Sequence, residues 1–298
     1  MQISKLGEFG LIDRIRKSIK TDTSVIVGSG DDCAVLEFDK KSYQLFTCDM
    51  LVEGVDFLKG TDFYWVGRKA VCVSISDIAS CCGVPQHCVI SLGLPKDLSL
   101  DKVDRLTKGI IAACKEYGVN LVGGDISKSQ KVVIDVSMIG RVEKNSLVLR
   151  SAARDKDIIF TTGSLGGSIK GKHLKFIPRL KEARFLAENF KVHSMIDISD
   201  GLLQDLGHIL KQSKKGAVLY QDLVPVSSQA KDFKASLTDG EDFELLFTVD
   251  SDCAKKLMRQ DKFCFYPIGE INCLKERIKL ILNNQDEKNI QPQGYRHF

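Results

Sequence analysis

The sequence predicts an α+β fold built from two domains. At 298 residues, the chain is longer than one small hydrophobic core usually supports. Hydrophobic residues make up 43% and charged residues 28% of the chain, values that are ordinary for globular proteins. β-rich runs and amphipathic runs alternate in both halves, with no repeat of solenoid period. We expect the domains to span residues 1–144 and 145–298, because a charged turn at 142–157 separates the halves.

The first half should contain several strands and three helices. Apolar residues recur at helical spacing between 7 and 19, and Val66, Ala70 and Val73 share one face of a helix at 64–82. The β-rich runs are separated by GSGDD and DKK, which are typical of turns. The expected elements are, in order, helix 7–19, strands 24–28, 33–38 and 43–50, helix 64–82, strand 88–94, helix 100–117 and strands 120–125 and 132–142.

The second half repeats this pattern. DIIFTTG is a β-rich run that enters a glycine-rich turn, PRLKEARFLAENF is amphipathic, and HSMIDIS leads directly into the helical run DGLLQDLGHILKQS. The expected elements are strand 157–163, helix 178–190, strand 193–199, helix 200–213 and strands 216–220, 244–249, 265–271 and 278–283.

Charge and hydropathy exclude some classes of function. The net charge of +4 is spread over 43 basic and 39 acidic residues, so nothing indicates a nucleic-acid partner. No apolar run approaches the roughly 20 residues that a membrane-spanning helix needs, and the N-terminal residues do not resemble a signal peptide. We therefore expect a cytoplasmic protein without a membrane partner.

Ten cysteines raise the question of disulfides or a zinc site. Most of them lie singly among apolar neighbours, as buried reduced thiols do. The run CCGVPQHC could supply soft ligands from Cys81, Cys82, His87 and Cys88, but adjacent cysteines suit one tetrahedral ion poorly. His208, among the leucines of LLQDLGHIL, fits packing better than metal ligation.

Acidic residues stand at the ends of β-rich runs and on an adjacent helix. An isolated acid of this kind is usually a turn residue or a helix N-cap. Asp197 is less easily explained in that way, because it interrupts an apolar strand between Ile196 and Ile198. The motifs are GSGDDC (Asp31, Asp32), FTCDM (Asp49), SISDIAS (Asp77), VGGDIS (Asp125) and IDISDG (Asp197, Asp200).

These acids can share one site only if cations accompany them. Two carboxylates about 5 Å apart repel by roughly 3 kcal/mol at an effective dielectric constant of about 20. Several such pairs would threaten a fold whose whole stability is about 5 to 15 kcal/mol. A few oxygen ligands per ion, completed by water, suit Mg²⁺. The pattern therefore predicts a magnesium site shared with phosphate oxygens.

The common nucleotide-binding motifs are missing. The chain has neither GxxxxGK[ST] nor the HRD and DFG motifs of protein kinases. GSLGGSIKG, at 163–171, could hold phosphate with its amides, although glycine-rich turns after strands serve many purposes.

Seven motifs in order give a more specific signal than any one of them. The chain contains GDDCAV, TCDMLVEGVDF, GRKAVCVSISDIAS, VNLVGGDISKS, LVLRSAA, MIDISDGLLQDLGHI and DGEDFELLFT. This set resembles the thiamine-monophosphate kinase family of the aminoimidazole ribonucleotide synthetase superfamily. The resemblance extends from GEFG at residue 7 to GYRHF at the end of the chain.

The resemblance implies a fold and a reaction. In a homodimer, the N-terminal β-sheets of two chains would form a shared barrel, and a C-terminal mixed sheet with helices would complete each protomer. ATP would lie between the two domains and, with several Mg²⁺ ions, pass its γ-phosphoryl group directly to thiamine monophosphate. Because the acceptor phosphate is already ionised, positioning and cation charge would do most of the catalytic work.

The resemblance also implies roles for individual residues. One of these residues, Arg150, could donate a forked contact to phosphate, but a salt bridge across the domain boundary explains it equally well. The implied metal ligands are Asp32, Thr47, Cys48, Asp49, Asp77, Asp125, Asp197 and Asp200, with Asp49, Asp125 and Asp197 as the catalytic residues. The implied nucleotide contacts are Tyr117, Gly124, Asp125, Arg150 and Ser199. The implied substrate contacts are Asp56, Glu241 and Tyr295, the last stacking on the thiamine ring.

Two residues depart from the family pattern. Asp56 stands where the family usually has His, and its charge would repel a substrate phosphate unless a cation lies between them. Lys128 replaces an arginine in GGDISKS and offers a point charge in place of a planar fork. These two departures leave open a nucleotide-binding dimer without activity. A separate alternative is another synthetase of the superfamily, making selenophosphate or acting on a purine intermediate. Selenophosphate synthetases carry a reactive residue near the N-terminus, whereas the first cysteine here is Cys33.

Overall fold

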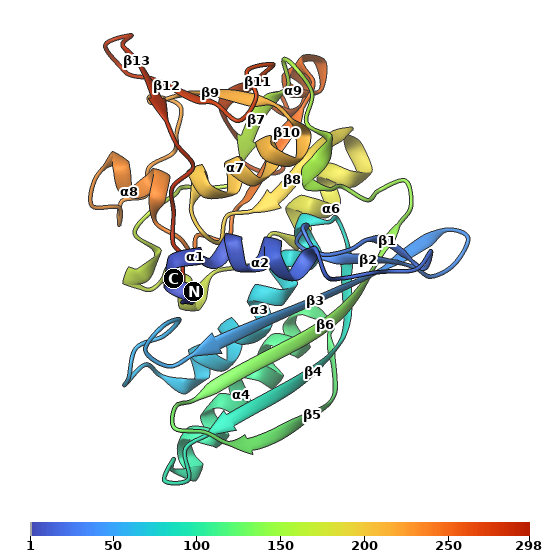
Figure 1. Ribbon diagram of the computed structural model, residues 1–298, viewed down its shortest axis with the longest axis vertical. Helices are drawn as coiled ribbons and strands as arrows, with labels where there is room; N and C mark the ends of the chain where they lie inside the picture. Colours follow the sequence, from blue (N-terminus) through green and yellow to red (C-terminus); the bar gives the residue numbers. More distant parts are fainter. Residues whose placement is uncertain (1) are drawn as a thin grey trace.

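The structure, a computed structural model that describes residues 2–298, has two lobes, each built on one β-sheet (Figure 1). The first sheet has six strands in the order β1-β2-β3-β6-β4-β5, and only β4 and β5 pair in parallel. Its strands are β1 (Val25–Val27), β2 (Ala34–Glu37), β3 (Ser42–Val52), β4 (Val84–Leu94), β5 (Asn120–Lys128) and β6 (Val133–Glu143).

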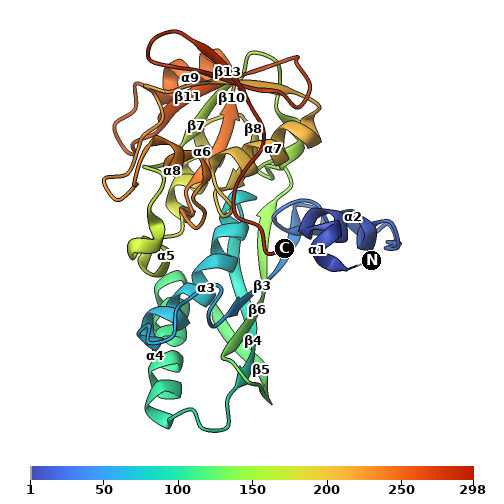
Figure 2. The same cartoon turned by 60° about the vertical axis from the view of Figure 1, so that its left-hand side comes forward.

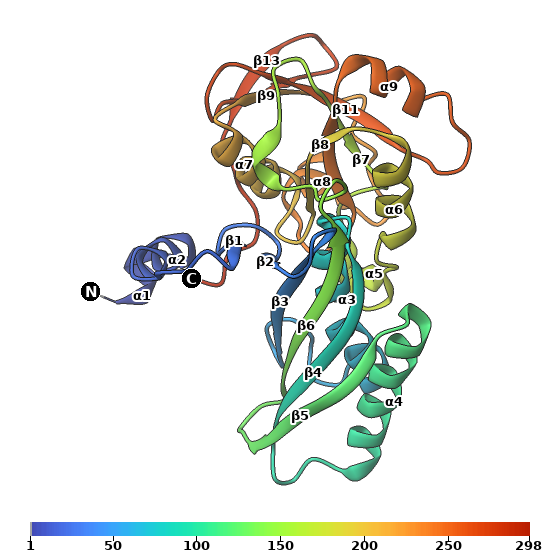
Figure 3. The same ribbon diagram turned by 90° about the vertical axis from the view of Figure 1, so that its right-hand side faces the viewer.

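Helices cover only one face of this first sheet. The helices α3 (Phe63–Ser80) and α4 (Leu100–Tyr117) pack side by side against it, as Figure 3 shows. Because successive side chains of a strand point to opposite faces, Thr47 and Asp49 of β3 point toward α3. Cys48 and Met50 lie on the other face, where both are exposed.

The second lobe has a seven-stranded sheet in the order β13-β12-β9-β11-β7-β10-β8, in which only β9 and β12 pair in parallel. Helices flank this sheet, and two hydrophobic clusters form its core. The strands are β7 (Ile158–Thr161), β8 (Val192–Asp197), β9 (Gly216–Tyr220), β10 (Leu245–Val249), β11 (Tyr266–Asn272), β12 (Ile278–Ile281) and β13 (Glu287–Ile290). The helices are α5 (Lys172–Lys175), α6 (Leu180–Asn189), α7 (Leu202–Ser213), α8 (Phe233–Thr238) and α9 (Ser251–Leu257), with short 3₁₀ turns η1 (Arg150–Ala152) and η2 (Ser168–Lys170).

Helix α3 connects the two lobes. Nearly all of its residues are buried, and its C-terminal end reaches the second lobe (Figure 2). There Ala79 packs in one cluster with Phe160 and Met195 of the second sheet. Residues on the C-terminal half of α3 can therefore face groups from both lobes.

The structure confirms the α+β fold class and differs from the prediction in local details. The helix expected at 7–19 corresponds to α2 (Glu8–Arg16). A short helix that was not expected, α1 (Ile3–Leu6), precedes it, and Gly7, whose φ of 71° lies outside the helical region, separates the two. Helices α8 and α9 were not expected, since each is too short to show a helical period. Both begin at an aspartate N-cap, Asp232 and Asp250. Within residues 2–298, no helix has the length and hydrophobicity that crossing a membrane requires.

Candidate active site

Three carboxylates from distant parts of the chain meet between the two lobes. Asp32 precedes β2, Asp77 lies on α3 and Asp197 ends β8, and each offers an oxygen within 4.8 Å of the other two. Ser76, the neighbour of Asp77 on α3, donates its hydroxyl to Asp197 Oδ2 at 2.5 Å. The structure thus brings together three of the predicted metal ligands. We call this group, with Asp49, the carboxylate cluster.

Strand β3 adds Asp49 to this cluster from the sheet side. Ser74 Oγ of α3 donates to Asp49 Oδ2 at 2.7 Å, and Thr47 Oγ1 donates to the Asp77 carboxylate. Hydroxyl groups therefore orient the carboxylates of Asp49 on β3 and Asp77 on α3, and each of these bonds uses only one oxygen of the carboxylate.

Burial opposes the ionisation of these acids. It raises the pKa of Asp49 to about 6, that of Asp197 to about 8 and that of Asp77 well above its usual value. The neighbouring charge of Asp32 adds to the rise at Asp197. Asp31, beside Asp32, has its pKa raised to about 7 by burial and then by the charge of Asp32. These acids can all be ionised near neutral pH only when a cation compensates their charge.

The donor set fits a small divalent cation. Asp32 Oδ2 is buried and has no hydrogen-bond partner among the described residues. A buried oxygen in this state costs free energy unless a donor or an ion satisfies it. The groups around it are carboxylates and a threonine hydroxyl, and such hard oxygen ligands suit Mg²⁺.

Arg150 pairs with the carboxylate cluster from the second lobe. Its Nε donates to Asp32 Oδ1 at 3.1 Å, and its backbone N–H donates to Asp31 Oδ2 at 3.2 Å. Burial alone would lower the pKa of Arg150, but the charge of Asp32 keeps that pKa above its ordinary value. In this structure, Arg150 therefore forms the salt bridge across the domain boundary that the sequence left open.

A second polar group lies at the start of α7. Asp200, Asp205 and His208 place ligand atoms within 4.8 Å of one another. However, Asp205 Oδ2 accepts from the backbone N–H groups of Asp200 and Gly201, each at 3.0 Å, and so holds the turn that leads into the helix. His208 packs edge-on against Phe9 with ring centroids 5.1 Å apart, and burial lowers its pKa to about 4. These contacts agree with a packing role for His208.

A cavity of about 610 Å³ lies beside the carboxylate cluster and shares Asp49 with it. Five of its lining residues are acidic, whereas Lys234 is the only lysine among the described residues of the lining. This excess of negative charge favours ligands that carry positive charge or arrive with metal ions. The acidic lining residues are Asp49, Asp56, Asp200, Asp239 and Glu241.

The three predicted substrate contacts all line this cavity. Glu241 is paired with the ammonium group of Lys69, and Tyr295 is held at the cavity by a 2.9 Å bond from its backbone N–H to Asp200 O. Asp56 Oδ2 accepts from the backbone N–H of Val52 at 2.7 Å. The carboxylate that replaces the family's usual His is therefore engaged within its own loop.

Three predicted residues lie away from the cluster, two of them on the exposed edge strand β5 and one on β3. Asp125 and Gly124 belong to β5, the outermost strand, and cross-strand pairing through β4 and β6 puts Asp125 on the same face as Met50. Asp49 points to the opposite face. Cys48 also lies on the uncovered face, where its thiol forms a hydrogen bond to Asp135 Oδ2, which does not belong to the carboxylate cluster. One chain by itself therefore does not bring these side chains to the carboxylate cluster.

The remaining predicted nucleotide contacts are divided between two places. Ser199 lines the cavity, and its carbonyl oxygen accepts from Glu241 N at 2.7 Å. Tyr117 lies at the end of α4, where its hydroxyl accepts from Arg68 Nη2 at 3.0 Å.

Comparison with known proteins now identifies the family. Residues 30–142 match AIR synthase related protein, N-terminal domain, and residues 145–276 match AIR synthase related protein, C-terminal domain. Thiamine-monophosphate kinase of Aquifex aeolicus is 32% identical, with 100% of both chains covered. That of Bacillus subtilis is 30% identical, over 98% of this chain and 100% of its own. The chain belongs to the thiamine-monophosphate kinase family.

Solved structures of this family agree with the fold. A structure described as AaThiL complexed with AMPPCP and TMP has a TM-score of 0.87 and 30% identity, covering 100% of this chain and 99% of the other. Thiamine monophosphate kinase from Aquifex aeolicus gives a TM-score of 0.80. The relatives that are 30% and 32% identical over nearly the whole chain are thiamine-monophosphate kinases, which favours this family over a purine or selenophosphate synthetase.

The sequence alone did not predict the residues that form hydrogen bonds or ion pairs with the carboxylates of the site. Ser74 and Ser76 orient Asp49 and Asp197, and Lys69 pairs with Glu241. Helical spacing gives a partial signal, because positions 69, 73, 76 and 77 share one face of a helix. The partners of that face come from other elements, and no local pattern indicates them.

The metal-free protein should lose stability as the pH rises from about 5 to about 9. The folded-state pKa values of Asp49 and Asp197, about 6 and about 8, lie above the ordinary value of 3.8. Within this pH range the unfolded chain binds fewer protons than the folded protein, so the stability that these groups contribute at low pH is lost. Mg²⁺ needs the deprotonated ligands, so its stabilising effect should grow over the same range.

Thermal unfolding followed by circular dichroism at several pH values, with EDTA or with Mg²⁺, measures this effect. We expect the two midpoints to coincide near the acidic end and to separate as the pH rises. A difference that stays constant across the range would contradict the coupling between these carboxylates and the metal.

Proposed function

We propose that this chain catalyses the ATP- and Mg²⁺-dependent phosphorylation of thiamine monophosphate to thiamine diphosphate, by direct in-line transfer of the γ-phosphoryl group. The observation that carries the proposal is the buried carboxylate cluster beside an acidic cavity. The names of the relatives, and a related structure described as holding AMPPCP and TMP, support this choice of substrates. We place the reaction in the cytoplasm and divide the chain into domains 1–144 and 145–298.

Asp32, Asp49, Asp77 and Asp197, with the Thr47 hydroxyl, are the residues that would hold Mg²⁺. The bound ions would supply positive charge that neutralises the phosphate oxygens and draws donor and acceptor together. Asp200 and Asp125 stay in the proposed ligand set on the family resemblance alone.

The chain's own groups position the reactants. In the transfer, a phosphate oxygen of thiamine monophosphate forms a bond to the γ-phosphorus while the bond to the β,γ-bridging oxygen breaks, and ADP leaves. Ser74 and Ser76 fix the rotamers of Asp49 and Asp197, so the ligand oxygens are pre-oriented before substrate binds. Arg150, freed from part of its pairing with Asp32 when cations enter, would donate a forked contact to phosphate.

The acidic cavity is suited to the other end of the substrate. The thiazolium ring of thiamine carries a permanent positive charge, and Glu241, Asp239 and Asp56 are among the acids that line the cavity. Tyr295 contributes an aromatic face, on which a cationic ring can stack.

The proposal is tested by incubating the purified protein with ATP, Mg²⁺ and thiamine monophosphate. Chromatography should show thiamine diphosphate and ADP in equal amounts, and none without the metal. If ATP binds calorimetrically while no diphosphate forms at any Mg²⁺ concentration, the chain is a nucleotide-binding relic and the proposed reaction is wrong.

We also propose that the chain forms a homodimer through its first sheet. The edge strand β5 is exposed along its whole length, and the uncovered face carries Phe46, Met50 and Val89, each more than 40% exposed. A long, apolar, unpaired edge readily pairs with another strand. A second copy of the chain would cover both features and complete the barrel that the family resemblance implies.

Val89→Glu should weaken this dimer, because Val89 is 41% exposed on the uncovered face and the charge would be buried when a second copy covers that face. Light scattering should give twice the mass of the chain for the wild type and a lower mass for Val89→Glu. The control is Met258→Glu, an equally drastic change on the second lobe, which should stay dimeric. A wild-type protein that is monomeric at all concentrations would contradict the proposal.

A further inference from the structure

Lys69 is a fully buried lysine beside the cavity. It lies on α3, none of its surface is exposed, and it is among the largest buried side chains. Lysine is almost never buried to this degree unless its charge is paired. Its ammonium group donates to the backbone oxygen of Asp56 at 2.8 Å and to the Glu241 carboxylate. Glu241 keeps 28% of its side chain exposed at the cavity, so the pair has one buried member and one accessible member.

These two contacts join the loops that border the cavity from opposite lobes. The Asp56 loop follows β3 in the first lobe, and the Glu241 loop precedes β10 in the second. Lys69 and Glu241 are 172 positions apart in the chain. Lys69 therefore connects the two walls of the cavity through a single charged group.

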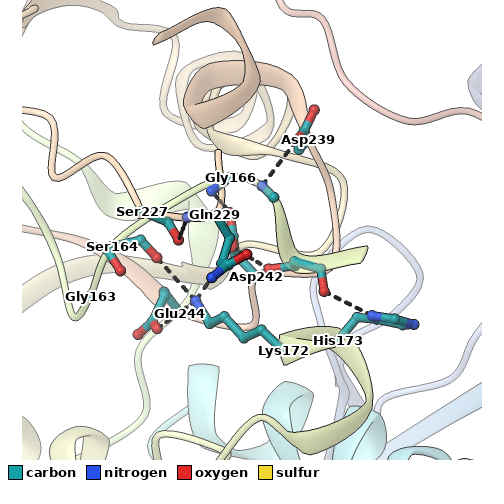
Figure 4. A network of polar contacts seen from close by, with 12 residues as sticks. Gly163, Ser164, Gly166, Lys172, His173, Ser227, Gln229, Asp239, Asp242 and Glu244 are labelled. Atoms are coloured by element: carbon teal, nitrogen blue, oxygen red, sulfur yellow. Dashed lines mark hydrogen bonds and ion pairs between the residues drawn. The ribbon is translucent and has the colours of Figure 1, made fainter. Parts of the chain in front are cut away.

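The backbone of the Glu241 loop is already fixed without Lys69. Glu241 has a φ of 63°, and its N–H donates to Ser199 O at 2.7 Å. Behind the loop, Asp242 accepts from Gly166 N at 2.7 Å, and Glu244 pairs with Lys172 at 2.9 Å (Figure 4). Since these bonds hold the main chain, the specific effect of Lys69 is on the direction of the Glu241 side chain.

Helix α3 separates this pair from the carboxylate cluster by a fixed length. Lys69, Val73 and Asp77 are spaced by four residues and share one face of the helix, and Val73 lines the cavity between them. Eight residues correspond to a rise of about 12 Å. Asp77 belongs to the end of the site that would hold metal and phosphate, so Lys69 lies at the opposite end.

We propose that Lys69 is a positioning residue, which orients the Glu241 carboxylate toward the end of the acceptor that carries no phosphate. This inference rests on the proposed function, because it assigns Glu241 to the thiamine moiety. Losing Lys69 should release Glu241 from its orientation and weaken the binding of thiamine monophosphate. ATP, which binds at the carboxylate end, should be affected little.

A double-mutant cycle tests the inference with Lys69→Met, Glu241→Gln and the variant that carries both. We expect Lys69→Met to raise KM for thiamine monophosphate about tenfold or more and KM for ATP less than about twofold. The double variant should be no worse than Glu241→Gln, because Lys69 acts through Glu241. Lys279→Met is the matched control, since Lys279 forms an ion pair with Glu287 in the second lobe, far from the cavity. It should behave as the wild type.

Two further comparisons complete the test. Lys69→Met could fail to fold because it leaves Glu241 without its partner. In that case the double variant, which removes both charges, is compared with Glu241→Gln. Calorimetric titration with thiamine, which has no phosphate, should show the same loss of affinity in all three variants. Effects that multiply in the double variant, or equal changes in both KM values, would overturn the inference. Absence of turnover in the wild type would instead refute the proposed function.

Discussion

Asp197→Asn should reduce kcat by at least about 10³-fold and should at the same time stabilise the metal-free protein at high pH. The substitution keeps the shape of the side chain and its bond from Ser76, so the local packing should persist. It removes one of the three carboxylates that lie within 4.8 Å of one another. Loss of a ligand lowers activity, whereas loss of a buried negative charge relieves repulsion.

The pH dependence separates these two effects. Burial raises the pKa of Asp197 to about 8, so the wild-type carboxylate is mostly protonated at pH 5 and ionised at pH 9. The gain in thermal midpoint of Asp197→Asn, measured with EDTA, should therefore be small at about pH 5 and large at about pH 9.

Asp252→Asn is the control for Asp197→Asn, because Asp252 is an acid of α9 with 83% of its side chain exposed. The activity and the thermal midpoint of Asp252→Asn should equal those of the wild type. A lowered midpoint of Asp197→Asn at high pH would show that this acid is structural, and retained turnover would remove it from the site.

Arg150→Met should have the opposite effect on stability. Arg150, whose side chain is 18% exposed, is the cation that pairs with the buried carboxylate of Asp32, and its backbone N–H donates to Asp31. Breaking a buried ion pair from one side typically costs about 3 to 5 kcal/mol, because the remaining charge stays buried without a partner. We expect a loss of this size in the metal-free protein, and Mg²⁺ should restore part of it by taking over the neutralisation of Asp32.

Arg150→Met should also raise KM for ATP, if the guanidinium contacts phosphate as proposed. Denaturant unfolding with and without Mg²⁺, together with steady-state kinetics, measures both effects. Arg141→Met is the control, since Arg141 forms an exposed pair with Asp39 that should contribute less than about 1 kcal/mol. An Arg150 variant as stable as wild type without metal would contradict the electrostatic account of the cluster.

Much of the fold could be predicted because its signals are local. The strand runs around Asp49 and Asp197 and the amphipathic helices show their periods directly in the sequence. The short helix α9 shows no period, and the break at Gly7 depends on a backbone conformation that a helical spacing does not reveal.

The site could be predicted in part for the same reason. An acid inside an apolar strand, as at Asp197, is costly enough to indicate a function from sequence. The side of the sheet to which Asp125 points depends on the register of β4, β5 and β6, which includes an irregularity at Cys88 and Val89. A one-residue change in register reverses every side chain of a strand, so spacing could not fix this position. The carboxylate partners of Lys69 and Arg150 lie more than 100 positions away and have no local signal.

The central claim is that Asp32, Asp49, Asp77 and Asp197 form one pocket for divalent cations between the lobes. Anomalous diffraction from crystals grown with Mn²⁺ and a non-hydrolysable ATP analogue tests it most directly. We predict strong peaks at about 2.2 Å from carboxylate oxygens of this cluster, with nucleotide phosphates on their other side. A bound nucleotide without any peak at these four carboxylates, or peaks only elsewhere on the molecule, would contradict the account.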